Sequence, residues 1–322
     1  MKTGRRVVGL DIGGSKCAVL LGESDDSQIK ILRKEIIESN PVVSPYGMID
    51  QLMSLIDRLT EGENFDAIGV SCGGPLDSDK GCIQCPPNLP LWEDIHITDI
   101  LEDKYHTDVF LENDANACAL AEWKLGAGIG TQNMIFLTFG TGLGAGLILN
   151  GKLYTGANGN AGELGHIRLS ENGPAGFGKR GSFEGFCSGG GLAQLGYTMA
   201  LEKLQTGKCP SYFDPESPAA VNAKTLAAAA AKGDETAIEV YRVCGEYLGR
   251  GLAILVDLLN PECIVLGSVF ARSRDLIWPT AEKMLRKEAI PASFEKCRIL
   301  PAALGEQIGD YAALMIAACG RE

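Results

Sequence analysis

The feature that most constrains this chain is a strand, a glycine turn and a second strand, a pattern that occurs twice. The first copy covers residues 7–21, with the turn sequence IGGS, and the second covers residues 134–149, with the turn sequence GTG. Each copy predicts a β-hairpin, because apolar runs flank a glycine-rich turn. Two hairpins of one design predict a duplicated fold with two similar halves, unless the hairpins arose independently.

Outside these hairpins, short apolar strands alternate with helices. We expect strands at residues 67–71, 108–111 and 262–266, and helices at 48–59, 115–125, 222–260 with a break at Gly233, and from about 306 onward. This alternation is typical of the α/β class with partly parallel sheets. The 322 residues suffice for two domains, which we place at 1–115 with 306–322 and at 116–305.

The composition argues against two classes of partner. The net charge is −12, and no dense cluster of Lys and Arg offers the basic face that nucleic acids or anionic membranes require. No apolar stretch resembles a signal peptide or a membrane span. The 11 cysteines lie mostly in apolar runs, as reduced and buried thiols do. We therefore expect a cytoplasmic protein that binds neither nucleic acid nor membrane.

The two glycine turns are candidate phosphate sites. Glycine allows successive backbone N–H groups to point at one anion, and Ser15, Lys16 and Thr141 would add further donors. Asp11, at the end of a predicted strand, would hold Mg²⁺ directly or through water. The alternative is two tight turns without a ligand. Their pairing beside an aspartate favours nucleotide binding.

Asp114 lies where a predicted strand gives way to a helix. Open α/β sheets bind ligands at such strand ends, and a carboxylate there can accept a proton from a substrate hydroxyl that attacks phosphorus. The alternative role is helix capping, for which Asp and Asn are preferred residues. The two roles can also divide between Asn113 and Asp114.

Three further segments contain polar or thiol groups. Glu163, His166 and Glu184 are suitable ligands for sugar hydroxyls, unless they belong to a solvated loop. Residues 173–180 have the spacing of a P-loop, but Arg180 stands where Ser or Thr must bind Mg²⁺. Cys82 and Cys85 form a single C-x-x-C motif without a second pair, which favours a turn or buried thiols over a metal site.

Taken in order, these stretches resemble the ROK family of bacterial sugar kinases. The matching stretches are DIGGSK at 11–16, GGPLD at 73–77, PNLP at 87–90 with Trp92, ENDAN at 112–116, TFGTG at 138–142 and AGELGH at 161–166. They extend through nearly the whole chain, and their joint order is more specific than any one of them.

The resemblance implies an actin-like (ribonuclease H-like) ATPase fold of the α/β class, with a cleft between two similar domains, and a homodimer. It implies ATP and Mg²⁺ as cofactors, a small-molecule sugar as substrate and Asp114 as general base. Residues that would bind the sugar are Gly74, Asn88, Asn113, Glu163, His166 and Glu184. Residues that would bind ATP are Asp11, Gly13, Gly14, Ser15, Lys16, Gly140, Thr141, Gly142, Gly267 and Ser268, with Asp11 holding Mg²⁺.

One departure from the family pattern concerns zinc. Typical members carry C-x-C-G-x-x-G-C-x-E after the histidine and bind a structural zinc there, whereas this chain has Ala175, Phe177 and Ser182 in place of the three cysteines. A structural zinc site needs four ligands, so His166 alone cannot keep the ion, and we expect no zinc. We expect Phe177 and Phe183 to pack and hold this loop instead.

The implied reaction is transfer of the γ-phosphate of ATP to the 6-hydroxyl of a hexose. Retained Glu163, His166 and Glu184 favour a glucose-like aldohexose. The alternatives are an N-acetylglucosamine or N-acetylmannosamine kinase, a fructokinase, an ATPase with another acceptor, or a non-catalytic sugar-sensing protein. ROK-like repressors carry an N-terminal winged helix-turn-helix, which we do not expect because the first phosphate motif begins at residue 11.

Overall fold

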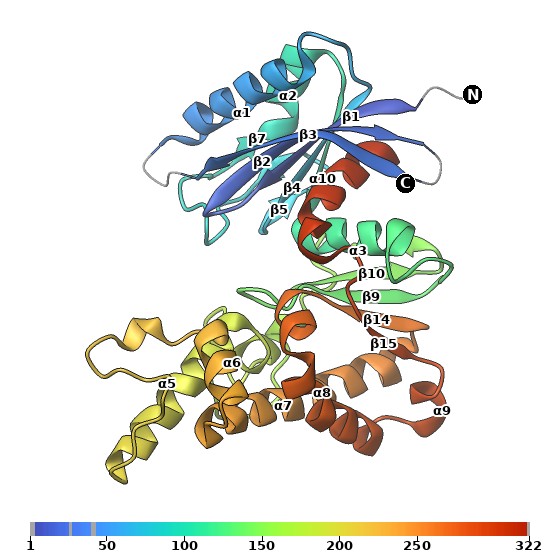
Figure 1. The fold of residues 1–322 in the computed structure, drawn as a ribbon. Coiled ribbons are helices and arrows are strands. Elements are labelled where there is room, and N and C mark those ends of the chain that lie inside the picture. Colours follow the sequence, from blue (N-terminus) through green and yellow to red (C-terminus); the bar gives the residue numbers. More distant parts are fainter. Residues whose placement is uncertain (1–3, 26–27, 40–42, 321–322) are drawn as a thin grey trace. The chain divides into compact units, whose positions relative to one another are not determined.

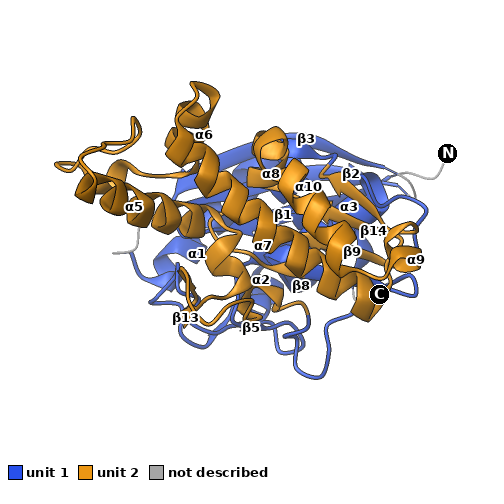
Figure 2. Ribbon diagram, turned by 90° about the horizontal axis from the view of Figure 1, so that it is seen from below, with its two compact units in different colours: residues 1–132, 146–161, 303–322 blue, residues 133–145, 162–302 orange. Residues whose placement is uncertain are grey.

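The computed structural model describes residues 4–25, 28–39 and 43–320 (Figure 1). The chain divides into two compact units (Figure 2). Unit 1 comprises Met1–Gln132, Gly146–Ala161 and Ala303–Glu322, and unit 2 comprises Asn133–Ala145 and Gly162–Ala302. The domain boundaries expected from the sequence remain a prediction.

The first five-stranded sheet lies in unit 1 and has the order β3-β2-β1-β4-β8. Its strands are β1 (Arg5–Ile12), β2 (Lys16–Ser24), β3 (Ile29–Glu38), β4 (Ala67–Cys72) and β8 (Asp108–Asn113). The predicted hairpin is confirmed, since β1 and β2 are antiparallel. β4 runs parallel to both β1 and β8, and the register pairs Asp11 with Ser71 and Cys72 with Asn113. The carboxyl ends of three parallel strands therefore share one edge of the sheet.

Helices cover both faces of this sheet (Figure 1). Helices α1 (Pro45–Thr60) and α2 (Ile97–Tyr105) lie on one face, and α3 (Asp114–Leu125) and α10 (Ile308–Cys319) lie on the other. Helix α1 begins at Ser44, whose hydroxyl accepts a hydrogen bond from the Gly47 N–H. The buried positions of α1 recur at helical spacing, as Leu52 and Ile56 do, so one apolar stripe faces the sheet.

Helix α10 packs against β1 and β4 at very short range. A Cβ added to Gly69 of β4 would lie 2.3 Å from the Ala313 carbonyl oxygen and 2.5 Å from the Ala317 nitrogen. A Cβ on Gly9 of β1 would lie 3.0 Å from the Ala313 Cβ. Two neighbouring strands therefore need glycine where the backbone of α10 touches the sheet.

A small sheet in unit 1 has the order β5-β6-β7. It consists of β5 (Leu76–Asp77), β6 (Cys82–Ile83) and β7 (Ile95–His96), and both pairs are antiparallel. Strands β6 and β7 flank the segment 84–94, which includes Asn88 and Trp92. Pairing of β6 with β7 therefore fixes the two ends of that segment.

The second five-stranded sheet has the order β11-β10-β9-β14-β15, which repeats the connections of the first. Its strands are β9 (Met134–Leu137), β10 (Ala145–Leu149), β11 (Lys152–Leu153), β14 (Cys263–Leu266) and β15 (Arg298–Pro301). In each sheet the first strand in sequence lies at the centre, with a hairpin partner on one side and parallel strands on the other. This common order confirms the predicted repetition of one design.

The two helices expected after Asn222 in unit 2 begin and end close to where the sequence predicts. The region after Asn222 is helical and is interrupted at Gly233, and Asn260 ends it in the left-handed conformation with φ of 45°. Asp234 caps the longer helix by accepting from two backbone N–H groups. The helices are α4 (Phe183–Phe186), α5 (Gly189–Gln205), α6 (Ala223–Ala231), α7 (Glu235–Leu259), α8 (Ser268–Glu288) and α9 (Pro291–Phe294).

Short elements complete the described chain. These are the hairpin of β12 (Ala175–Gly176) and β13 (Lys179–Arg180), and 3₁₀ turns at Leu164–His166, Pro218–Ala220 and Gly305–Gln307. The P-loop spacing at 173–180 thus forms a hairpin and not a strand followed by a helix.

All eleven cysteines are free thiols, and Cys72, Cys244 and Cys263 are buried. Within residues 4–25, 28–39 and 43–320, none of the helices combines the length and apolar character needed to cross a bilayer.

The contact between α10 and the sheet gives a prediction for stability. We expect Gly69→Ala to lower the free energy of unfolding by about 3 kcal/mol, because the added methyl overlaps backbone atoms that cannot move away alone. The matched control is Gly73→Ala, where no atom lies within 4 Å of the added Cβ, and its effect should stay within about 0.5 kcal/mol. Urea unfolding measures both, and equal stability of the two variants would contradict this packing.

Candidate functional site

Negatively charged side chains lie at the edge of the unit 1 sheet where β1, β4 and β8 end. Burial raises the pKa of Asp11 from 3.8 to about 6, and repulsion from Asp114 and Asp310 adds to the rise. Lys16 and Lys34 act in the opposite direction but do not cancel it. The carboxylate of Asp11 is therefore poorly neutralised by the side chains around it.

Asp114 lies close enough to interact with the same group. Desolvation raises the pKa of Asp114, although its side chain retains solvent-accessible surface, which screens part of the effect. Burial is the main cause of the raised pKa of the Cys72 and Cys118 thiols. The negative charges of Asp114 and Asp11 raise it further, so both thiols lie within electrostatic range of both carboxylates. The charge of Asp114 therefore contributes to the raised pKa of Asp11, after burial.

The start of α3 resolves the two alternatives for Asp114. Asn113 is the N-cap, since its Oδ1 accepts a hydrogen bond of 2.9 Å from the Ala115 N–H. Asp114 is the first helical residue, so Asn113 and not Asp114 is the N-cap of α3. A Cβ on Gly74 would lie 3.4 Å from the Asn113 Nδ2, which brings Gly74 and Asn113 together.

Glu112 supports this helix start in a way that the sequence motif does not reveal. Its Oε1 accepts hydrogen bonds from the Asn113 N–H at 2.8 Å and from the Asn116 Nδ2 at 2.9 Å. Asn116 is buried, and its own Oδ1 has no hydrogen-bond partner among the described residues. The side chain of Glu112 thus links the end of β8 to the first turn of α3.

The first glycine turn presents polar groups to solvent. Gly13 donates its N–H to the Lys16 carbonyl at 3.1 Å, and Ser39 binds the turn from β3 by donating its N–H to Ser15 and its hydroxyl to Gly13. Ser15 and Lys16 are exposed. The turn is therefore fixed at its backbone while the side chains of Ser15 and Lys16 stay accessible.

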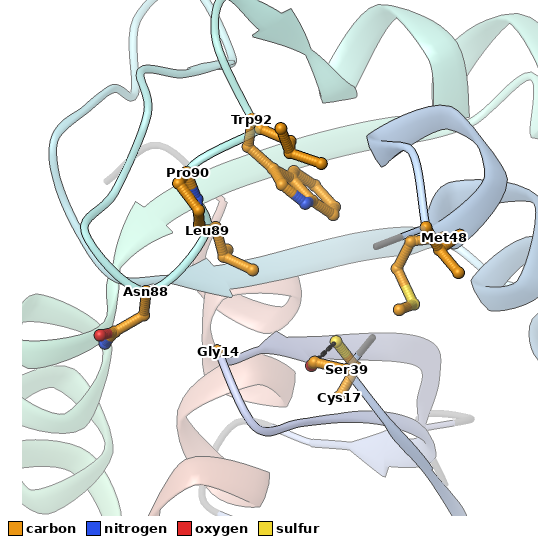
Figure 3. A pocket seen from close by; sticks show the side chains of 10 residues that line it. Gly14, Cys17, Ser39, Met48, Asn88, Leu89, Pro90 and Trp92 are labelled. Carbon is orange, nitrogen blue, oxygen red and sulfur yellow. Dashed lines mark hydrogen bonds between the residues drawn. The ribbon is translucent and has the colours of Figure 1, made fainter. Parts of the chain in front are cut away.

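Gly14 connects this turn to the segment that carries Asn88. A Cβ on Gly14 would lie 2.5 Å from the Asn88 Cβ and 2.7 Å from the Asn88 carbonyl oxygen. A small pocket lies beside this contact, where Leu89, Trp92 and Met48 point inward and Asn88 points away (Figure 3). The apolar side of the segment thus packs on unit 1 and leaves the Asn88 amide accessible.

The surroundings of Asp11 fit a divalent cation. Carboxylate oxygens are the ligands that Mg²⁺ prefers, and the negative charges nearby would be relieved by a cation. A Cβ on Gly309 of α10 would lie 3.0 Å from the Asp11 Oδ2. The absence of a side chain at this position therefore leaves that carboxylate oxygen open. Neither Gly309 nor Asp310 was found by sequence reasoning, since both lie about 300 residues from Asp11.

Unit 2 contains the second glycine turn. The Gly140 N–H donates to the Gly142 carbonyl at 2.9 Å, and the turn packs on the first residues of α5. Gly189 donates to the Gly140 carbonyl at 2.8 Å, and Gly190 donates to the Thr141 carbonyl at 3.2 Å. The turn therefore lies at a helix N-terminus, where the backbone favours anions.

Gly267 and Ser268, which the sequence predicts to bind ATP, lie beside this turn. The start of α5 was not predicted from the sequence. A Cβ on Gly267 would lie 2.7 Å from the Thr138 carbonyl oxygen, and Ser268 follows at the start of α8. Unit 2 thus brings Gly267 and Ser268 beside the residues 138–142. The signal for α5 was present in the sequence SGGG at 188–191, because Ser is a preferred N-cap before a helix.

Glu184 also contacts the second turn. Its Oε2 accepts a hydrogen bond of 3.0 Å from the Leu143 N–H. A Cβ on Gly165 would lie 2.2 Å from the Leu143 carbonyl oxygen and 3.2 Å from the Glu184 Cβ. Glu163 and His166 flank this glycine and are exposed. Unit 2 therefore places Glu184 next to the segment that carries the other two predicted sugar ligands.

The loop that lacks the zinc cysteines is held by hydrogen bonds and one aromatic ring. Gln194 of α5 accepts from the Ala175 N–H at 3.0 Å and donates to its carbonyl at 2.8 Å. Phe183 is fully buried, and a Cβ on Gly251 would lie 2.2 Å from its ring. Phe177 is 70% exposed, so the expectation that it packs to hold the loop is wrong. Phe177 occupies the hairpin turn with φ of 43°, and its ring meets the His166 ring edge-on at a centroid distance of 6.2 Å.

The family assignment follows from comparison with known proteins. Residues 7–318 match the family model described as "ROK family". This chain belongs to the ROK family. Its structure is also similar to that of a ROK family glucokinase from Streptomyces griseus in complex with glucose and AMPPNP, with a TM-score of 0.78, 29% identity, and coverage of 98% of this chain and 100% of that chain. The actin-like ATPase fold expected from the sequence is confirmed.

Relatives of known activity include both enzymes and regulators. The glucokinase of Thermotoga maritima is 31% identical over 285 residues, which cover 87% of each chain. The xylose repressor of Bacillus subtilis is 27% identical over 302 residues, which cover 93% of this chain and 73% of the repressor. The matches support a sugar kinase of the ROK family, and regulators of the same family are the alternative.

The raised pKa of Asp11 gives a prediction for stability. A carboxyl group with a pKa of about 6 in the folded protein and 3.8 when unfolded destabilises the fold as pH rises through this interval. We expect Asp11→Asn to raise the free energy of unfolding by about 1–3 kcal/mol at pH 8 and to change it little at pH 3.5.

Chemical denaturation at a series of pH values measures this difference. The matched control is Asp108→Asn, an exposed position at the start of β8. A difference between Asp11→Asn and wild type that does not grow with pH would contradict the proposed surroundings of Asp11.

Proposed function

We propose that this chain is an ATP-dependent sugar kinase that transfers the γ-phosphate of ATP to the 6-hydroxyl of a hexose. A glucose-like aldohexose is the favoured substrate, and Asp114 is the general base. The observation that carries the proposal is the first turn of α3, where Asn113 serves as the cap and Asp114 interacts with the carboxylate of Asp11. The sequence and structural similarity to glucokinases supports a sugar as the class of substrate.

The two glycine turns are proposed to bind the phosphates of ATP. Their residues are Gly13, Gly14, Ser15 and Lys16 in unit 1 and Gly140, Thr141 and Gly142 in unit 2, with Gly267 and Ser268 near the adenosine. Asp11 is proposed to hold Mg²⁺ directly or through water. When bound, Mg²⁺ supplies positive charge that stabilises the transferring phosphoryl group.

Backbone and side-chain groups are proposed to hold the sugar. Residues proposed to bind its hydroxyls are Gly74, Asn88 and Asn113 in unit 1 and Glu163, His166 and Glu184 in unit 2. Such contacts align one hydroxyl with the γ-phosphorus, which lowers the entropic part of the barrier. Asp114 accepts the proton of that hydroxyl as its oxygen forms the new bond to phosphorus, and ADP leaves.

The raised pKa of Asp114 suits this role. A base whose pKa is above that of an ordinary aspartate holds the proton more strongly after transfer. Glu112 accepts a hydrogen bond from the Asn113 N–H. Glu112 is therefore proposed to position the start of α3 and not to contact the sugar. A cytoplasmic homodimer is proposed on the family resemblance alone.

A coupled assay of ADP release across a panel of sugars tests the reaction and its acceptor. The panel contains glucose, mannose, allose, fructose, N-acetylglucosamine and N-acetylmannosamine. We expect release that depends on sugar and is fastest with an aldohexose. If ADP release is fastest with an N-acetylhexosamine or with fructose, that sugar becomes the assigned substrate in place of an aldohexose. ADP release that does not depend on sugar would indicate an ATPase. Sugar binding without release would favour the sensor, the reading suggested by the related xylose repressor.

The role of Asp114 gives a separate prediction. We expect Asp114→Asn to lower kcat by about 10²–10⁴, because the amide cannot accept the proton, while the sugar still binds. The change in tryptophan fluorescence on sugar addition measures binding, since Trp92 lies four residues from Asn88. Asp108→Asn is the matched control and should keep wild-type turnover. Near-normal turnover of Asp114→Asn would refute its assignment as general base.

A further inference from the structure

A group of metal-binding side chains lies in unit 1 away from all the residues assigned above. Cys82, Asp94 and His96 each place a ligand atom within 4.8 Å of the other two. The Cys82 Sγ lies 3.3 Å from the Asp94 Oδ1, and the His96 Nε2 lies 3.7 Å from the same oxygen. No other group of three such side chains meets this criterion among the residues that the structure describes.

The Cys82–Asp94 and His96–Asp94 separations of 3.3 Å and 3.7 Å are close to those of tetrahedral coordination. Metal–ligand distances of about 2.3 Å to sulfur and 2.0–2.1 Å to nitrogen and oxygen imply ligand separations of about 3.3–3.6 Å. Cys82 and His96 are paired residues of the antiparallel strands β6 and β7, so the sheet itself holds these two side chains on one face. Asp94 adopts the left-handed conformation with φ of 54° just before β7.

The outer contacts of the histidine also fit a metal ligand. While the His96 Nε2 faces Asp94, its Nδ1 lies 3.9 Å from the Asp99 Oδ2. At 3.9 Å the carboxylate lies beyond hydrogen-bond distance and acts on the ring through its charge; the hydrogen bond that is usual for metal-binding histidines needs a small shift of the Asp99 side chain. The nearby cation Lys80 is paired with Asp77 at 2.8 Å and does not occupy the place of a metal.

We propose that Cys82, Asp94 and His96 bind a Zn²⁺ ion, with water in the fourth position. Side-chain exposures of 79% for Asp94 and 45% for His96 leave that position open to solvent. On binding, the Cys82 thiol loses its proton to the buffer and the thiolate sulfur bonds to the metal, with no change of oxidation state. The thiolate and one carboxylate balance the charge of the ion.

The ion joins the two ends of the segment 84–94. Cys82 precedes this segment, and Asp94 and His96 lie at its end. A metal bond between the ends shortens the free loop and stabilises the folded form. The site is separate from His166. It departs from the expectation of no zinc, because that expectation rested on the family's zinc loop alone. The C-x-x-C motif contributes only Cys82, since the Cys85 thiol donates to the Pro90 carbonyl.

Titration with Co²⁺ tests the proposal on untagged, chelator-treated protein under reducing conditions. We expect one equivalent to bind with an ultraviolet thiolate-to-cobalt charge-transfer band, and Zn²⁺ should displace it. Cys82→Ser should lose the band, and His96→Asn should bind at least tenfold more weakly. Asp99→Asn should weaken binding about tenfold, as second-sphere changes do.

Matched controls separate this site from other thiols and histidines. Cys85→Ser and His106→Asn change exposed residues of unit 1 outside the group and should bind as wild type does. Zn²⁺ should raise the Tm of wild type and of both controls but not of His96→Asn, a surface variant expected to fold normally. Absence of the band in wild type, its persistence in Cys82→Ser, or wild-type affinity in His96→Asn would overturn the proposal. The proposal does not depend on the kinase activity.

Discussion

Burial of the Asp11 carboxylate within range of a second carboxylate, Asp114, is the constraint around which the edge of the unit 1 sheet is arranged. Asp11 ends β1, and Asp114 follows β8, with β4 between them. Burial and repulsion raise the pKa of Asp11 to about 6. Holding two such groups together costs free energy, which the rest of the unit must offset.

The packing of α10 offers that compensation. The helix closes on the sheet through glycines of β1 and β4, and its first turn brings Gly309 and Asp310 to Asp11. Asp310 is in turn paired with Lys34 at 2.6 Å. A charged edge is thus supported by a densely packed apolar helix, as expected of a site in which stability is sacrificed for chemistry.

Local features of this fold could be predicted from the sequence. Hairpins, strand ends and the start of α3 depend on neighbouring residues, so Asp114 could be placed at the head of a helix before its contacts were known. Contacts between distant segments could not be predicted. Gly309 beside Asp11, Gln194 holding Ala175, and the start of α5 on the second turn each join residues that no short motif relates.

Two expectations show where pattern reasoning is weakest. Phe177 was expected to pack, yet the hairpin places it at an exposed turn, because turn geometry decided its position and not its apolar character. The C-x-x-C motif was set aside for want of a second pair. Its first cysteine instead meets Asp94 and His96 through the pairing of β6 with β7, which motif spacing does not reveal.

The pH dependence of kcat/KM for the sugar tests the central account most directly. If Asp114 takes the proton, the rate falls at low pH with an apparent pKa above 3.8, the ordinary value for aspartate, because burial raises the pKa of Asp114. A rate that stays constant down to the pH at which an ordinary aspartate protonates would contradict the account.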